Sequence, residues 1–436
     1  MSIEHVTLIL ILSAFVLFAA GFPIGFALGA VGLIYSLVFF GPKFLPVAAQ
    51  AALGSMTSFL MVAIAGFVFM GMILRFSGVA AAMYDTMYKW MGRLNGGLAI
   101  GTVLVCTAMA AMVGIISAGI MTAGTIALPE MFHRKYDKHM VMGSIMSGGV
   151  LGTLIPPSVP MILYALYSRQ SVGRLFAGGM IPGLILSTLY IIYIGIRCGL
   201  NPDMGRAIPP EERASWKEKV VSLKDAVLFV SLILGVLGSI FLGLATPTEA
   251  SAVGALGAAL IAAIYGKLSW KVIKGASYET MKLLGMVLWI MVGIGIFNSF
   301  FMAIGGIDLI KNLVVGISPW TVLIGMQLSL FILGMVMDDY AIVMIATPLY
   351  APVIVSLGFD PIWFGILFIM NMGMGMMTPP YGFAHFYMKA VVPKDILMSD
   401  IWRSVIPFVG LQMIALIIVM AFPQLALWLP GLIFQR

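Results

Sequence analysis

Long apolar segments separated by short polar ones set the pattern of this chain. A helix needs about 20 predominantly apolar residues to cross the hydrocarbon core of a bilayer, with some allowance for tilt. The pattern therefore predicts an all-α, polytopic membrane protein. Segments that fit one crossing each lie at about 5–20, 22–40, 56–75, 176–197, 226–243, 247–265, 283–303 and 404–429. Two further segments are predicted to lie along the membrane interface, at 79–93 and 306–316.

Two longer apolar segments are predicted to form hairpins. The middle of the first, at 96–132, reads VGIISAGI and has no charge or turn cluster suited to a solvated loop. We favour a re-entrant hairpin with its tip inside the membrane over two full crossings, although both give the same topology. The second hairpin is expected at 319–357, with Asp338 and Asp339 at its tip.

A helix interrupted by two prolines is predicted after each hairpin. The first, at 139–168, is interrupted at Pro156-Pro157, and the second, at 362–388, at Thr378-Pro379-Pro380. A helix broken inside a membrane is tolerated only where its freed backbone groups face protein, water or an ion. These two breaks therefore predict a binding site near the middle of the membrane.

The two halves of the chain share a spacing that indicates an internal duplication. Residues 223 positions apart are identical at several places. Chance is a poor explanation, because the identical residues include a double proline and an aspartate. The pairs are Pro129 and Pro352, Asp137 and Asp360, Gly152 and Gly375, Pro156 and Pro379, Pro157 and Pro380, and Tyr164 and Tyr387. We expect a first repeat at 1–197, a cytoplasmic linker at 198–225 and a second repeat at 226–436.

Composition and charge narrow the class further. Hydrophobic residues make up 61% of the chain and charged residues 9%, and the mean hydropathy of +1.10 excludes a soluble protein. The net charge of +7 does not indicate nucleic-acid binding, because the Lys and Arg residues lie in short clusters between apolar segments. With the N-terminus outside, all but five of the 24 Lys and Arg fall on the cytoplasmic side. The five exceptions are Lys43, Arg169, Arg174, Lys311 and Arg436.

This topology gives each half five spans, so the two copies are expected to have opposite orientations. The first hairpin would then enter from the cytoplasm and the second from outside. Opposed hairpin tips beside two broken helices are typical of alternating-access transporters with a site near the midplane.

The candidate ligands are oxygen atoms, which a hard cation such as sodium requires. Asp338 is the strongest candidate and Asp339 ranks below it, the alternative being a carboxylate paired with a structural partner. Thr378 and Ser158, beside the two breaks, could add hydroxyl oxygens or could bond back to their own helices. Ser117, at the first tip, is a weaker candidate.

Other polar residues have competing interpretations. Thr246 to Glu249 fit a helix-capping box better than an acidic functional motif. His385 could contact an anionic substrate or bond within the bundle, and Asn371 could orient the site or join helices. Cys106 and Cys198 indicate neither a disulfide nor a metal site. The sequence has no ATP-binding motif and no catalytic or metal-ligand motif, so we expect no enzyme, no cofactor and no metal other than sodium as the coupling ion.

Several motifs together resemble the large membrane subunit of tripartite ATP-independent periplasmic (TRAP) transporters, over nearly the whole chain. They are LIPPS at 154–158, SVGRLFAGGMIPG at 171–183, ATPTEA at 245–250, the Asp-Pro of LGFDPIWFGI and the MTPP break. The resemblance implies an inverted-repeat, ion-transporter-type fold that works as a sodium-driven, elevator-type importer in a bacterial inner membrane. It also implies three partners: a small four-helix membrane subunit, a periplasmic solute-binding protein and an organic acid anion delivered by that protein.

The resemblance also implies where the two ion sites lie. The first would involve the tip from Gly114 to Ser117 together with Pro156 and Ser158. The second would involve Asp338 and Thr378. Many members have a Ser-rich first tip that ends in Asp, where this chain has VGIISAG, and His385 stands where Asn is frequent.

Three other functions compete with this interpretation. A stand-alone sodium/carboxylate symporter would need no binding protein. An integral membrane enzyme is disfavoured because no catalytic constellation is present, and a passive channel is disfavoured by the two opposed breaks.

Overall fold

The computed structural model describes residues 2–434, and within them the secondary structure is entirely helical, with twenty α-helices and three short 3-10 helices. The first repeat predicted above contains α1 (Ile3–Ala19), α2 (Ile24–Phe40), η1 (Pro42–Phe44), α3 (Leu45–Met56), α4 (Leu60–Phe76), α5 (Ala80–Met91), α6 (Gly97–Val113), α7 (Ile116–His133), α8 (Lys138–Leu154), α9 (Val159–Ser168) and α10 (Val172–Leu200). After η2 (Pro202–Met204) and η3 (Pro210–Glu212) follow α11 (Trp216–Phe241), α12 (Pro247–Ile264), α13 (Trp270–Ala303), α14 (Gly306–Leu313), α15 (Pro319–Val336), α16 (Asp339–Ser356), α17 (Pro361–Met376), α18 (Phe383–Lys389), α19 (Met398–Ala421) and α20 (Gln424–Phe434).

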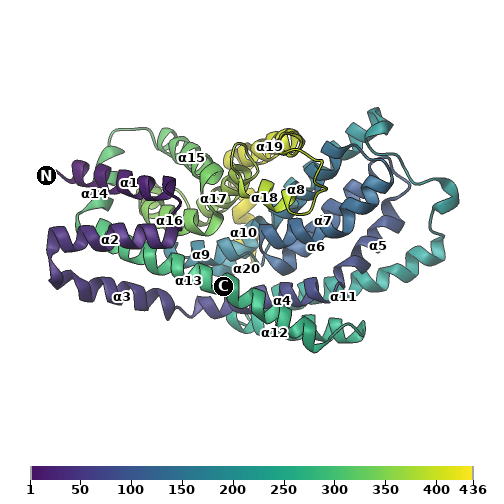
Figure 1. Ribbon diagram of the computed structural model, residues 1–436, viewed down its shortest axis with the longest axis horizontal. Helices are drawn as coiled ribbons and strands as arrows, with labels where there is room; N and C mark the ends of the chain where they lie inside the picture. The colour runs from purple at the N-terminus through teal and green to yellow at the C-terminus, as the bar shows by residue number, and fades with distance from the viewer. Residues whose placement is uncertain (1, 435–436) are drawn as a thin grey trace.

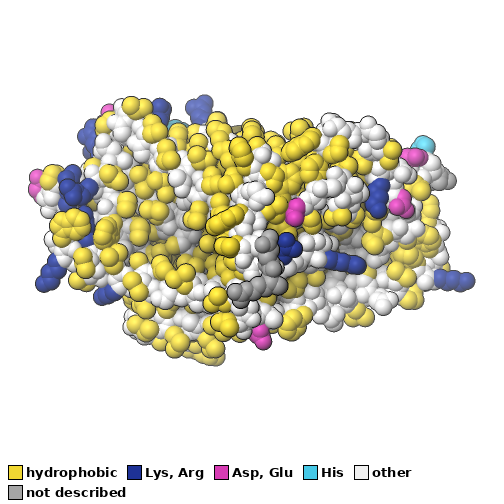
Figure 2. Space-filling model, turned by 180° about the vertical axis from the view of Figure 1, so that it is seen from behind, with side chains coloured by type: hydrophobic (Ala, Val, Ile, Leu, Met, Phe, Trp, Pro, Cys, Tyr) yellow, Lys and Arg dark blue, Asp and Glu magenta, His cyan; other side chains and the backbone are white. Residues whose placement is uncertain are grey.

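The surface and the helix lengths confirm a multi-pass membrane protein. Eight described helices or helix pairs are long and apolar enough to cross a bilayer, and a ninth is added if η1, α3 and α4 count as one bent span. Apolar side chains cover most of the face shown in Figure 2. Lipid rather than water is the solvent that such a surface fits.

Helices α1 to α4 and α11 to α13 pack into one layer of the molecule. Helix α4 lies along α12, and α13 lies along α2, α3 and α4. Glycines allow the closest approach, because a Cβ added at Gly293 of α13 would lie 1.8 Å from the carbonyl oxygen of Gly25 in α2. Small residues at helix crossings are the usual means of tight packing in membranes.

The two predicted hairpins are present. Helices α6 and α7 form the first, and α15 and α16 form the second. In Figure 1 the first hairpin lies to the right of α10 and α17 and the second to their left. The first tip is inside the protein, because Gly114 and Ile115 are buried, with Ile115 only 3% exposed. A buried tip favours a re-entrant hairpin over two spans joined by a solvated loop.

The two interrupted helices are also present, as the pairs α8–α9 and α17–α18. The first break spans residues 155–158 and the second 377–382. Proline has no backbone N–H to continue the helical ladder, which accounts for both positions. The Pro156-Pro157 and Pro379-Pro380 bonds are both cis.

Five of the predicted spans differ from the structure at their ends. The segment before residue 56 is the unpredicted helix α3, and the η1–α3 segment meets α4 at a bend of 40°. The span at 283–303 is the last part of α13, which begins at Trp270 after the cap residue Ser269. The last span divides at residues 422–423, where proline ends α19. Helices α10 and α11 extend into the polar segment 198–225, which leaves 201–215 between them.

The segment 201–215 binds the loop that joins α5 to α6. The backbone N–H of Gly96 donates to the carbonyl of Gly205 at 2.7 Å, and that of Ile208 donates to the carbonyl of Gly92 at 2.8 Å. The connection between the halves is therefore fastened to the base of the first hairpin.

Arg134 ties three elements together beside this segment. Its guanidinium lies 2.6 Å from Glu212 of η3 and 3.1 Å from Glu130 of α7, and it donates to the hydroxyl of Tyr88 in α5 at 2.7 Å. Desolvation lowers the pKa of Arg134, but hydrogen bonds to Glu212 and Glu130 outweigh it and raise that pKa above its ordinary value. Arg134 therefore stays charged and holds α5, α7 and η3 together.

Candidate functional site

The first hairpin tip is in contact with the first break. Gly114 ends α6 in the left-handed region, with a φ of 64°. Its carbonyl accepts a hydrogen bond from the N–H of Val159, at 3.3 Å, just beyond the break. A Cβ at Gly114 would lie 2.3 Å from the carbonyl oxygen of Pro157, so only glycine fits without a shift.

Ser158 and Pro156 lie in the first break, where every residue from Leu151 to Ala165 is buried. The hydroxyl of Ser158 donates to the carbonyl of Thr153 at 2.5 Å and accepts from the N–H of Met161, so Ser158 caps α9. The hydroxyl proton of Ser158 is thus donated within its own helix pair, while the hydroxyl oxygen has a lone pair left with which it could bind a cation. Ser117 is half-buried in α7.

The second tip carries the two adjacent carboxylates. Asp338 is the N-cap of α16, and its carboxylate accepts from the N–H of Ala341 at 3.0 Å. Asp339 is only 5% exposed. Within residues 2–434, neither carboxylate has a Lys, Arg or His nitrogen within 4 Å. Asp338 is half-buried and Asp339 is buried, and a carboxylate that is removed from water without a cationic partner is costly.

The second break lies against the second tip. The N–H of Gly382 donates to the carbonyl of Met335 at 3.1 Å. The hydroxyl of Thr378 donates back to Met374 in α17 at 2.8 Å. As at Ser158, the proton is committed to the helix and the oxygen remains available as an acceptor.

Corresponding residues make corresponding bonds in the two halves. Asp137 caps α8 by accepting from residues 139 and 140, and Asp360 caps α17 by accepting from residues 362 and 363. Val159 and Gly382, the donors that join each break to its tip, are also 223 positions apart. The acceptors of these two bonds, Gly114 and Met335, are 221 positions apart, and the duplication stays a prediction.

Each broken helix also reaches the hairpin of the other half. Helix α9 packs against α16, and α18 packs against α7. The stems of the two broken helices, α8 and α17, pack against each other as well. The two tips and two breaks therefore form one interlocked bundle.

Asn371 joins two helices of this bundle. Its side-chain amide donates to the backbone carbonyl of Gln327 at 2.5 Å and to the side-chain oxygen of Gln327 at 2.7 Å. Nearby, Gln412 donates to Met370 and accepts from Tyr190. These contacts favour the helix-joining interpretation of Asn371.

His385 is fully buried in α18, and its Nδ1 bonds to the carbonyl of Gly382 at 2.8 Å. The carbonyl can only accept, so Nδ1 carries the hydrogen and Nε2 is the acceptor. Within the described part of the chain Nε2 has no hydrogen-bond partner. His385 thus lies in the protein interior just after the second break, and it does not line the cavities described below.

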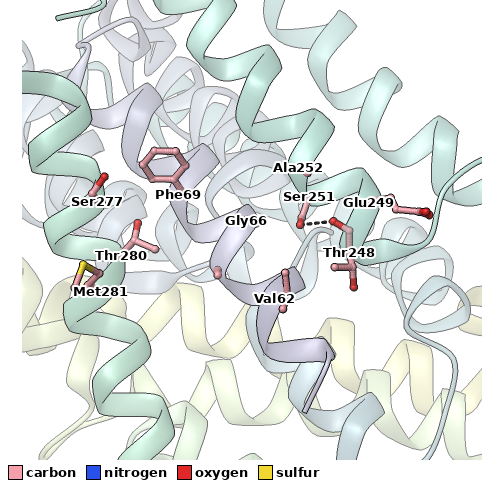
Figure 3. A pocket seen from close by; sticks show the side chains of 11 residues that line it. Val62, Gly66, Phe69, Thr248, Glu249, Ser251, Ala252, Ser277, Thr280 and Met281 are labelled. Atoms are coloured by element: carbon pink, nitrogen blue, oxygen red, sulfur yellow. Dashed lines mark hydrogen bonds between the residues drawn. The ribbon is translucent and has the colours of Figure 1, made fainter. Parts of the chain in front are cut away.

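The acidic motif at the start of α12 is a cap. Thr246 and Glu249 make both reciprocal hydrogen bonds of a capping box, which confirms the structural interpretation. Figure 3 shows Glu249, together with Thr248 and Ser251 of the same helix, on an open, apolar groove of about 630 Å³ between α4, α12 and α13. None of the residues that line this groove belongs to a hairpin or a broken helix.

A second cavity, of about 420 Å³, lies directly beside the second tip and break. Met337 of the tip and Tyr381 of the break form one wall, and residues of α1 and of the α1–α2 turn form the other. This cavity, unlike the groove, adjoins the candidate ion ligands.

Residues 11–425 match the family described as "Tripartite ATP-independent periplasmic transporter, DctM component". The chain belongs to this family. It is therefore a large permease subunit of a TRAP transporter, as the motifs at the two breaks predicted.

Relatives of this large permease subunit share about 30% of its residues over most of their length. The C4-dicarboxylate TRAP transporter large permease protein of Pseudomonas aeruginosa is 32% identical, over 85% of this chain and 86% of its own. The corresponding protein of Vibrio cholerae is 31% identical over 95% of both chains. The sialic acid TRAP transporter large permease protein of Vibrio cholerae is 29% identical, over 95% of this chain and 96% of its own.

Two solved structures share the fold of the permease. The YdaH transporter of Alcanivorax borkumensis superposes with a TM-score of 0.63 and covers 90% of this chain and 91% of its own, at 13% identity. MtrF of Neisseria gonorrhoeae superposes with a TM-score of 0.59 over 90% of this chain and 85% of its own, also at 13% identity. The fold prediction, an ion-transporter-type arrangement of helices, is confirmed at this level.

Sequence reasoning missed Gln327, the partner of Asn371, and the nearby amide Gln412. Gln327 and Gln412 are buried amides in apolar helices and could have been noticed as isolated polar residues, but their pairing is long-range. The aromatic wall opposite Tyr381 had no sequence signal, because Phe15, Phe18 and Phe22 look like ordinary membrane-facing residues.

Proposed function

We propose that this large permease subunit imports an organic acid anion together with sodium ions across the bacterial inner membrane. The unpaired carboxylates at the second tip carry the proposal. Sodium would supply the positive charge that Asp338 and Asp339 lack among the described residues. Backbone carbonyls at the tips and breaks, with the hydroxyl oxygens of Ser158 and Thr378, would supply further ligands.

The first ion site would depend more on backbone oxygens than the second. Gly114 and Pro156 contribute no polar side chain, and Ser117 is the one hydroxyl of the first tip. The contact between Gly114 and the break brings tip and break carbonyls close together. Sodium accepts such carbonyl ligands readily.

The bundle of hairpins and broken helices would move as a unit against the layer formed by α1 to α4 and α11 to α13. The interlocked contacts of α9 with α16 and of α18 with α7 support this elevator-type motion. A small four-helix membrane subunit and a periplasmic solute-binding protein would complete the transporter. The organic acid is proposed because relatives are named for C4-dicarboxylates and sialic acid.

Sodium-driven uptake in proteoliposomes tests the coupling. Asp338→Asn keeps a good capping residue but removes the charge, so helix α16 should form normally. We expect the apparent sodium affinity to fall by at least the roughly tenfold that loss of an outer-shell partner costs at metal sites. Asp360→Asn is the matched control, because Asp360 caps α17 in the same way outside the site. Equal sodium dependence in both variants would remove Asp338 from the site.

The requirement for a binding protein is tested in the same liposomes. Uptake should be absent until the cognate binding protein is added with the small subunit. Rapid sodium-dependent uptake by the large subunit alone would instead support a stand-alone symporter.

A further inference from the structure

The two breaks differ sharply in exposure. At the first break, all residues from Leu151 to Ala165 are buried. At the second, Tyr381 is 59% exposed and Val336 of the adjoining tip is 53% exposed. The second tip and break therefore form the open side of the site, and the cavity of about 420 Å³ lies there. That volume is in the range of pockets for small organic molecules.

The wall of this cavity that faces the tip is aromatic. Phe15 and Phe18 come from the end of α1, and Phe22 from the turn that leads into α2. Tyr381 carries the one side-chain hydroxyl among the described residues that line the cavity. An alkyl or aryl group placed against three phenyl rings gains burial, whereas a polyhydroxylated group loses hydrogen bonds to water there.

The cavity also lacks cationic side chains. None of the described lining residues is Lys, Arg or His, and the nearest charge along the chain is Asp338, next to the lining residue Met337. A carboxylate entering here meets an acidic residue, so its counter-charge must come from a sodium ion bound at the tip. One carboxylate can be placed toward that ion, while a second would be left against phenyl rings.

We propose that the cavity between α1 and the second tip binds a monocarboxylate with an apolar portion. The carboxylate faces the tip and Tyr381, and the apolar portion lies on the rings of Phe15, Phe18 and Phe22. This inference rests on the proposed sodium-coupled function and adds a substrate class to it. It separates this chain from relatives named for dicarboxylates or for a polyhydroxylated sugar acid.

Three six-carbon acids test the proposal, because adipate and gluconate each differ from hexanoate in one kind of group. Hexanoate is an apolar monocarboxylate, adipate carries a second carboxylate, and gluconate carries hydroxyl groups. A cysteine at position 19, introduced as Ala19→Cys in permease held in lipid nanodiscs, reports occupancy through its rate of maleimide labelling, because Ala19 lines the cavity and its replacement leaves the three phenyl rings in place. The native Cys106 and Cys198 are both buried and give little background. Trp216→Cys, at an exposed position outside the cavity, is the control.

We expect hexanoate with sodium to slow labelling at position 19 and not at position 216. Adipate and gluconate should need at least about tenfold higher concentrations, the factor that burial of roughly two methylenes would produce. Equal protection by all three acids, or protection by none, overturns the proposal. Slow labelling that no acid changes means that a lipid chain fills the cavity, which also overturns it.

A second pair of variants separates the wall from the fold. Phe18→Ser in the Ala19→Cys background should raise the hexanoate concentration for half-protection roughly tenfold and leave that of gluconate unchanged, whereas Phe18→Leu should change neither. A parallel change for both acids would overturn the assignment of the wall. The sodium dependence of uptake in Asp338→Asn is measured separately, so failure of the substrate class and failure of sodium coupling give different results.

Discussion

Gly114→Ala tests whether contact between the first tip and its break matters for ion binding. The added Cβ would lie 2.3 Å from the carbonyl oxygen of Pro157, about 1 Å inside the 3.4 Å at which ordinary contacts begin. The neighbouring atoms belong to the backbone, so the tip has to move. That movement would break the hydrogen bond from Val159 to Gly114, which is already 3.3 Å long.

Two separable effects lower the free energy of unfolding of Gly114→Ala. A non-glycine residue at a φ of 64° costs roughly 1–2 kcal/mol, and forcing an extra carbon into a packed contact costs typically about 1–3 kcal/mol more. Gly243→Ala is the matched control, because Gly243 has a φ of 70° but nothing within 4 Å of the added carbon. Gly243→Ala should therefore show the conformational cost alone.

Thermal unfolding and sodium-dependent uptake are measured for both variants. We expect Gly114→Ala to lower the melting temperature more than Gly243→Ala and to weaken apparent sodium affinity, while Gly243→Ala leaves that affinity unchanged. If the two variants behave alike in both assays, the contact between tip and break contributes nothing to the site, and the reasoning from the Gly114 geometry is wrong.

Two further predictions concern the contacts around the bundle. Asn371→Ala leaves the amide oxygen of buried Gln327 without its partner and should cost about 1–3 kcal/mol, seen as a lower melting temperature, whereas the exposed Asn312→Ala should change it little. Arg134→Gln removes the charge that joins α5, α7 and η3, so proteases should cut residues 206–213 faster than in the parent protein. An unchanged cleavage rate there would show that Arg134 does not fasten this segment, and Arg174→Gln, at an exposed Arg with no ion pair among the described residues and outside this segment, is the control.

Local signals in the sequence were enough to locate the hairpins and the breaks. Apolar length predicts helices, a double proline interrupts them, and Thr246 to Glu249 carry a capping box that depends only on neighbours three residues apart. The spacing of 223 residues linked the two halves before any contact was known. These features are local or periodic, so they can be read from one chain.

Contacts between distant segments could not be predicted in this way. The sequence did not predict helix α3, which precedes residue 56, or the first part of α13. Both segments have mixed composition, and packing rather than helix propensity decides their length. Nothing in the sequence indicated that Asn371 meets Gln327 or that Phe18 faces Tyr381. Asp338 was identified as a ligand candidate from its apolar surroundings, but its role as the cap of α16 depends on where the second tip turns.

The exchange of partners between α9 and α16 and between α18 and α7 has a mechanical consequence. A hairpin that opened by itself, as a lid does, would pull away from the far half of the opposite broken helix and disturb the oxygen atoms at both sites. Loss of one cation would then change the geometry of the other site through packed side chains, and no chain of charged residues between the sites would be needed. In the sodium-coupled transport proposed above, such an arrangement would disfavour intermediates that carry only one of the two ions.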